Sequence, residues 1–195
     1  MLDHVFTDAI GALRDAFANA YLERQAFEEH FQSDILLGDL VWETTYGLPG
    51  EGLPPRVVAH ITLNWPSWSQ ATYRQWYIEE EISQQPAIEI EVVFRLQRLA
   101  VQPTPHVVDS VATEHSPNIG SEQLQRDNIT IEISHASHGN RDAEYALEIT
   151  YEGQYELAEE TLIDGASKVL DEHFGVLGAW VASTLVKLGD LKLAF

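Results

Sequence analysis

Tyr145-Ala-Leu-Glu-Ile-Thr-Tyr-Glu-Gly-Gln-Tyr-Glu-Leu157 alternates apolar and polar residues along its whole length. Its odd positions are aromatic or aliphatic apart from Gly153, and its even positions include Glu148, Glu152 and Glu156. Successive side chains of a β-strand point to opposite faces. The stretch therefore predicts a long antiparallel strand with one buried face and one acidic face exposed to water.

Gly153 lies on the apolar face of this predicted strand, between Tyr151 and Tyr155. Its missing side chain leaves a dent on that face. At roughly 3.3 Å per residue the strand would be more than about 40 Å long, which is longer than strands usually are. We therefore expect the strand to bend at Gly153 and to change partners there.

The same alternation predicts the rest of the sheet. It recurs in residues 57–64, 88–97 and 129–134, and a short turn joins the last of these to the opening strand as a hairpin. Residues 34–46 alternate less regularly, which predicts a strand that is either partly buried on both faces or bulged at Gly38.

Two connecting segments have no clear strand pattern. Residues 65–83 favour a short helix, capped by Ser67 or Ser69, or an irregular segment, over a strand in residues 71–78. Residues 100–127 contain several prolines and form a long connection for a compact domain. We expect this connection to be either mobile or functional.

Helical periodicity appears at both ends of the chain. Residues 4–31 place apolar side chains at spacings of three and four, which predicts an amphipathic helix. The same spacing returns in residues 159–188, where Gly175 and Gly178 predict a break between two helices.

Together these patterns predict a single α+β domain that spans residues 1–195. Its N-terminal helix is expected in residues 1–33, its antiparallel sheet of about five to seven strands in 34–157, and its two C-terminal helices in 158–190. We expect the helices to cover the tyrosine face of the opening strand, so that its glutamate face is the solvated outside of the sheet.

The chain is strongly acidic. Its 195 residues carry 31 acidic and 11 basic side chains, for a formal net charge of −20. Such a charge repels nucleic-acid phosphates and anionic membranes, and it favours either a basic partner or simple solubility. Lysine is scarce, so adaptation to a salty cytosol is a second explanation for the acid excess.

No part of the sequence indicates export or membrane insertion. The N-terminus lacks the basic and apolar regions of a secretory signal, and the most apolar run is far shorter than the roughly 20 residues that span a bilayer. We therefore expect a cytoplasmic protein.

Metal and nucleophile motifs are weak in this sequence. The chain has no cysteine, which excludes disulfides, thiolate catalysis and cysteine-bound zinc. His135 and His138, with Asp142 nearby, are the strongest metal candidates. They fall at a hairpin turn, where the spacing of three does not direct two side chains to one point as it does on a helix. Phosphate-binding glycine loops and Gly-x-Ser-x-Gly elbows do not occur. We therefore expect no metal and no cofactor.

Paired glutamates are the other candidates for catalysis. Glu89 with Glu91, and Glu148 with Glu152, lie on the same face of their predicted strands. Acid–base hydrolysis needs two carboxylates in different environments, whereas these share one solvated face. We therefore expect the protein not to be an enzyme.

The densest aromatic group of the chain is the best candidate for a contact surface. It consists of Trp65, Trp68, Tyr73, Trp76 and Tyr77. Exposed aromatic side chains favour the binding of apolar or peptide ligands. The alternative is that these residues are part of the core.

The end of the chain resembles a known family. Between residues 128 and 193, two alternating strands precede a helix, an interruption at Phe174-Gly175-Val176-Leu177-Gly178 and a second amphipathic helix, which closes with Gly189 and then Leu191-x-Leu193. This order is similar to that of the SecB family of export chaperones. The resemblance implies a homo-oligomeric holdase that wraps unfolded, often basic, polypeptide along apolar grooves.

Three functional hypotheses follow. The first is a non-enzymatic acidic module that binds another protein, basic or unfolded, as a chaperone or adaptor. The second is a small-molecule carrier, whose apolar pocket between sheet and C-terminal helix would be lined by Tyr145, Tyr151, Tyr155 and Trp180. The third is an acidic immunity or mimic protein that blocks a nucleic-acid-binding protein through its charge.

Overall fold

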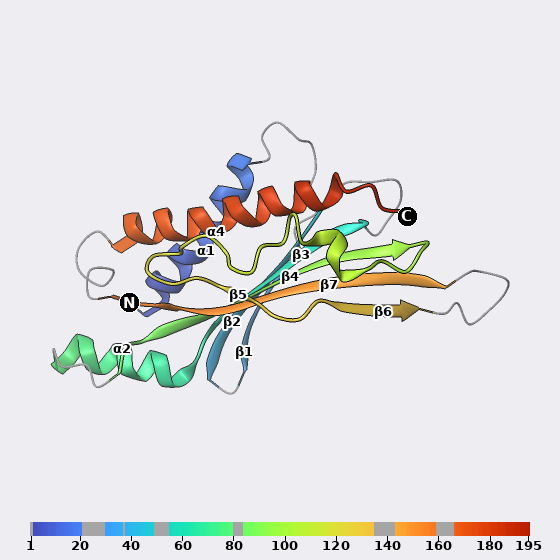
Figure 1. The fold of residues 1–195 in the computed structure, drawn as a ribbon. Helices are drawn as coiled ribbons and strands as arrows, with labels where there is room; N and C mark the ends of the chain where they lie inside the picture. Colours follow the sequence, from blue (N-terminus) through green and yellow to red (C-terminus); the bar gives the residue numbers. More distant parts are fainter. Residues whose placement is uncertain are drawn as a thin grey trace.

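The computed structural model describes residues 2–20, 30–36, 38–48, 55–79, 84–134, 143–158 and 166–195. Within these residues, seven strands form one antiparallel sheet, and helices α1 and α4 pack together over one of its faces (Figure 1). The α+β class and the antiparallel sheet predicted from the sequence are therefore confirmed.

The described elements follow one another along the chain in a fixed order. They are α1 (Leu2–Ala20), β1 (His30–Leu36), β2 (Asp39–Gly47), β3 (Val57–Trp65), α2 (Ser67–Glu79), β4 (Ala87–Leu99), the 3-10 helix η1 (Pro105–Val108), β5 (Gln125–Arg126), β6 (Thr130–Ser134), β7 (Glu144–Glu156) and α4 (Ala166–Gly189). In the sheet the order is β1-β2-β3-β4-β7-β5, and β6 also pairs with β7.

Strand β7 is the stretch that predicted the fold. Leu147, Ile149, Tyr151 and Tyr155 are buried, whereas Glu152 and its even-numbered neighbours at the end of the strand are exposed. This confirms one dry face and one acidic face. Alternation alone was enough to orient the strand, because burial of one face fixes which side chains point inward.

The expected change of partners at Gly153 is wrong in position. Strand β7 pairs with β4 on both sides of Gly153. On its other edge the partner does change, from β6 at residues 144–148 to β5 at Tyr151 and Glu152. The change therefore precedes the glycine and affects one edge only.

The dent at Gly153 holds a side chain from the long connection. A Cβ atom at Gly153 would lie 2.8 Å from Leu124 Cδ2 and 3.2 Å from the Gln123 carbonyl oxygen. Leu124 is buried in the core. Glycine suits this position because the connection packs directly against the strand backbone.

The connection over residues 100–127 carries an ordered layer of the core. Ser116 N donates to the Leu124 carbonyl at 2.9 Å, Leu124 N donates to Ser116 Oγ at 2.8 Å, and Arg126 N donates to the Glu114 carbonyl at 2.8 Å. The Tyr151 hydroxyl donates to the Thr113 carbonyl at 2.7 Å and ties the layer to β7. These bonds satisfy backbone groups that a buried connection would otherwise leave unpaired.

The predicted break between two C-terminal helices is wrong. Helix α4 runs without interruption from Ala166 to Gly189, and residues 159–165 lie outside the described residues. A Cβ atom at Gly178 would lie 2.7 Å from Ala16 Cβ and 3.1 Å from the Leu13 carbonyl oxygen of α1. The glycine thus permits two helices to approach closely instead of ending one of them.

Two predictions near the N-terminus are also corrected. The N-terminal helix was expected to reach residue 31, within a segment ending at 33, but residues 30–33 belong to β1. The predicted bulge at Gly38 is a turn, in which Gly38 has a φ of 94° and joins β1 to β2 as an antiparallel hairpin. Glycine suits that turn because L-residues rarely adopt positive φ. Residues 21–29 lie outside the described residues.

The short helix expected in residues 65–83 is confirmed as α2. The side chain that caps its start is Asp39, and not Ser67 or Ser69 as predicted. The Ser67 amide donates to Asp39 Oδ1 of β2 at 2.7 Å. Ser69 is buried instead, where its Oγ accepts from Trp65 Nε1 at 2.9 Å and donates to the Ala87 carbonyl at 2.7 Å.

Replacing Asp39 by alanine is expected to lower the free energy of unfolding by about 1 kcal/mol, because the start of α2 loses both a hydrogen-bond acceptor and a negative charge. Asp39→Asn keeps an acceptor and is expected to lose less. Urea denaturation of both variants measures the difference. Equal stability of Asp39→Ala and the native protein would show that this contact does not hold the helix.

A candidate binding face on the open side of the sheet

The face of the sheet opposite α1 and α4 is open and polar. Antiparallel alternation turns Thr62 and Asn64 of β3, Glu89 and Glu91 of β4, and Glu152 of β7 to this side, and all five are exposed or half-buried. The alternate residues of the same strands form the core. Helices α1 and α4 cover that side of the sheet in Figure 1. We call the opposite, polar side the open face.

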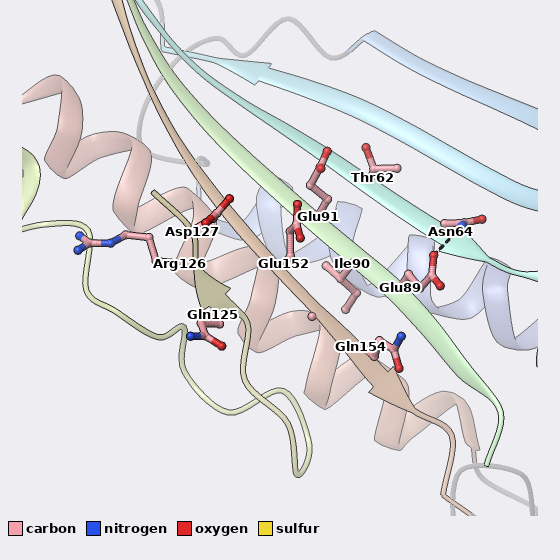
Figure 2. A pocket seen from close by; sticks show the side chains of 11 residues that line it. Thr62, Asn64, Glu89, Ile90, Glu91, Gln125, Arg126, Asp127, Glu152 and Gln154 are labelled. Carbon is pink, nitrogen blue, oxygen red and sulfur yellow. Dashed lines mark hydrogen bonds between the residues drawn. The ribbon is translucent and has the colours of Figure 1, made fainter. Parts of the chain in front are cut away.

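A hollow of about 740 Å³ lies on the open face, between β3, β4, β7 and β5 with the residue that follows it, Asp127. Four carboxylates line it, those of Glu89, Glu91, Asp127 and Glu152; we call it the acidic hollow. Figure 2 shows the Glu91, Asp127 and Glu152 carboxylates pointing to the same side of the sheet.

Two of these carboxylates face each other across neighbouring strands. Glu91 is the register partner of Glu152. Side chains at such positions have Cβ atoms roughly 4.5–5.5 Å apart, and like charges there destabilise a sheet. Neither glutamate takes part in an ion pair among the described residues. The pair therefore leaves concentrated negative charge on the open face.

The neighbouring polar groups do not neutralise this pair. Glu89 Oε2 accepts a hydrogen bond from Asn64 Nδ2 at 2.8 Å. The Arg126 guanidinium points away from Glu91 and Glu152 in Figure 2 and lies 3.4 Å from Asp109 Oδ1 instead. The acidic hollow thus keeps a net negative charge.

A matched pair farther along the same two strands gives a direct contrast. Arg95 is the register partner of Glu148, and its guanidinium forms ion pairs with Glu148 and, at 2.7 Å, with Glu132. Burial acts to lower the pKa of Arg95, but the two carboxylates outweigh it and raise the pKa. At one end of the open face the carboxylates are therefore paired with Arg95, and at the other end two glutamates face each other without a cation from the described residues.

The predicted aromatic contact group is divided by the fold. Trp65, at the end of β3, is fully buried and Tyr73 of α2 is 8% exposed, and their rings lie 5.7 Å apart. Trp68 is 38% exposed and Trp76 is half-buried. The side chain of Tyr77 lies outside the described residues. Two members are thus core residues, and one described member is exposed.

The predicted pocket residues pack against one another. Tyr151 and Tyr155 are buried, and the Trp180 ring lies 4.9 Å from that of Tyr151. The Tyr155 hydroxyl is 2.8 Å from His173 Nδ1, and burial raises the pKa of both tyrosines to about 12. Tyr145 is half-buried at the opposite end of β7 and lines a different hollow. The structure therefore does not bring these four residues together around one cavity.

The sequence missed the opposition of Glu91 and Glu152. It paired glutamates along single strands, Glu89 with Glu91 and Glu148 with Glu152. The opposition across strands depends on the register of β4 against β7, two strands joined by a long connection, and local pattern does not reveal that register. The sequence shows only that both strands carry glutamates on their polar faces.

Other candidate sites gain no support within the described residues. No group of three or more His, Asp or Glu side chains there is placed to hold a metal ion, and the predicted His135 and His138 lie outside them. None of the helices described has the length and apolar character needed to cross a bilayer.

Comparison with known proteins returned no relative. No protein-family model, no curated protein and no solved structure matches the chain.

Proposed function

We propose that this protein is a non-enzymatic binding module that holds a basic segment of another polypeptide on the open face of its sheet. The observation that carries the proposal is the opposed, unneutralised pair of Glu91 and Glu152 within the acidic hollow. A cationic side chain placed between these carboxylates relieves a repulsion that the free protein bears.

The charge of the whole chain supports the same class of partner. A net charge of −20 attracts cations over the surface and speeds the encounter with a basic partner, while it disfavours nucleic acids. The acidic hollow supplies the local binding site, and the negative electrostatic field of the whole chain guides a basic partner toward it.

The expected ligand is a polypeptide rather than a single small cation. One exposed ion pair contributes at most about 1 kcal/mol. A micromolar Kd corresponds to about 8 kcal/mol, so several contacts along the face are required. A chain with more than one basic residue provides them. The unfolded or basic client implied by the resemblance to export chaperones is of this kind; that resemblance, a homo-oligomer and a cytoplasmic location remain predictions.

Fluorescence anisotropy with labelled peptides tests the proposal. An unstructured peptide rich in lysine and arginine is expected to bind, and peptides of the same length with neutral or acidic residues are not. Raising the salt concentration from ~0.05 M to ~0.5 M is expected to weaken binding strongly, because exposed charges are then screened beyond a few ångströms. Absence of binding to the basic peptide at low salt, or affinity that does not respond to salt, would refute the proposal.

A further inference from the structure

A second hollow, of about 510 Å³, lies toward the other end of β4 and β7, beside β6. Arg95, Arg98, Glu132, Ser134 and Glu144 are among the residues that line it; we call it the arginine hollow. Arg95 is already occupied by Glu132 and Glu148. Arg98 is therefore the cation of this hollow that remains available.

Arg98 is positioned by an irregularity of the strand. The register between β4 and β7 shifts between Leu96 and Leu99, and Arg98 has a φ of 60°, a left-handed conformation that is unfavourable for a side chain of this size. Such a backbone conformation persists only where surrounding contacts hold it.

The Arg98 side chain lacks partners among the described residues. Its Nε atom is buried and has no hydrogen-bond partner, and no ion pair joins the guanidinium to any described carboxylate. This is unusual in a chain with 31 acidic residues. A ligand carboxylate at the guanidinium would supply the charge-assisted hydrogen bonds that no described carboxylate gives to Arg98.

The distance between the two hollows sets the number of residues that an extended peptide needs to reach both of them. Seven positions separate Glu91 from Arg98 along β4, and the bulge removes one of them, so the strand-equivalent distance is six residues, or about 20 Å. An extended peptide that lies along the strands covers the same distance in about six residues. Its residues i and i+6 then point to the same side, because the side-chain period of an extended chain is two.

We propose that Arg98 binds an acidic side chain of the same partner segment whose basic residue occupies the acidic hollow. This inference rests on the proposed function and adds to it a sequence requirement: a basic residue with an aspartate or glutamate about six positions away. The open face is then read as a two-point site, negative at Glu91 and Glu152 and positive at Arg98. A uniformly basic segment satisfies only the first point.

Binding of a small peptide set tests this inference. The parent peptide carries a basic cluster and glutamine at the other positions; two derivatives place glutamate six positions after or six positions before the cluster, because the chain direction is not specified. One derivative is expected to bind about five-fold tighter than the parent, the gain of roughly one additional ion pair. A glutamate moved by one residue, to the opposite side of the chain, is expected to give no gain.

Variants of Arg98 test whether this residue causes the gain in affinity from the peptide glutamate. Arg98→Gln is expected to abolish the gain from glutamate, and Arg98→Glu to reverse it, so that lysine at the same peptide position binds better. Lys168→Gln, which removes an exposed positive charge from α4 on the other side of the molecule, is the matched control and is expected to keep the gain. Binding of the parent peptide with no gain from either glutamate, or a gain that survives in Arg98→Gln, would overturn this inference and leave the proposed function intact. Failure of every basic peptide to bind the native protein would overturn both.

Discussion

Gly178→Ala is expected to destabilise the protein by about 1–3 kcal/mol, although alanine is a better helix former than glycine. The added Cβ would lie 2.7 Å from Ala16 Cβ and 3.1 Å from the Leu13 carbonyl oxygen. Both atoms belong to α1, and one of them is backbone, so the whole helix must shift to make room. Because α1 and α4 pack along each other over the sheet, that shift disturbs the core beneath them.

Gly175→Ala is the matched control, three residues earlier in the same helix. A Cβ atom at Gly175 would meet nothing within 4 Å. Only the higher helix propensity of alanine remains, so the free energy of unfolding of this variant is expected to rise by about 0.5–1 kcal/mol. Chemical denaturation of both variants measures whether each change lowers or raises the free energy of unfolding. If Gly178→Ala were as stable as Gly175→Ala, the close approach of α1 to α4 would be refuted.

The double variant Glu91→Gln/Glu152→Gln is expected to lose affinity for a basic peptide by ten-fold or more while the fold becomes slightly more stable. Removing two like charges from opposed positions relieves a repulsion of about 0.2–1 kcal/mol. The same change removes the charges that attract the ligand, and a ten-fold loss corresponds to about 1.4 kcal/mol. Affinity and stability thus change in opposite directions, which a merely damaged fold does not produce.

A second double variant controls for net charge. Asp171→Asn/Glu172→Gln removes two negative charges from exposed positions on α4, on the other side of the sheet. It is expected to lower affinity much less, through the weaker long-range field alone. Anisotropy measurements at equal salt compare the two. Equal losses for the two double variants would show that overall charge, not the acidic hollow, attracts the ligand.

The sheet was predictable because its signal is local. The alternation in 145–157 fixes which side chains are buried, and the period of two has to be satisfied within the strand itself. The sequence of residues 159–188 predicts two helices because each glycine weakens a helix by about 1 kcal/mol. In the structure, contact with α1 requires a small residue at Gly178, and this tertiary requirement prevails over propensity.

The candidate site was less predictable because it depends on register. Glu91 and Glu152 are far apart in the sequence, and only the pairing of β4 with β7 opposes them. Arg98 depends on a register shift that no sequence motif marks. The buried layer in residues 100–127 was likewise hidden, because prolines and polar residues surround the few side chains, such as Ile119 and Leu124, that enter the core. Turn-forming composition indicated a loop but not what the loop covers.

Amide chemical-shift mapping of the isotope-labelled protein with a basic peptide tests the location of the binding face most directly. The largest shifts are expected on β3, β4 and β7, around Thr62–Asn64, Glu89–Glu91 and Glu152–Gln154, and the exposed side of α4 is expected to be unchanged. Shifts confined to α2 or α4, or no shifts at a peptide concentration that saturates the anisotropy signal, would contradict it.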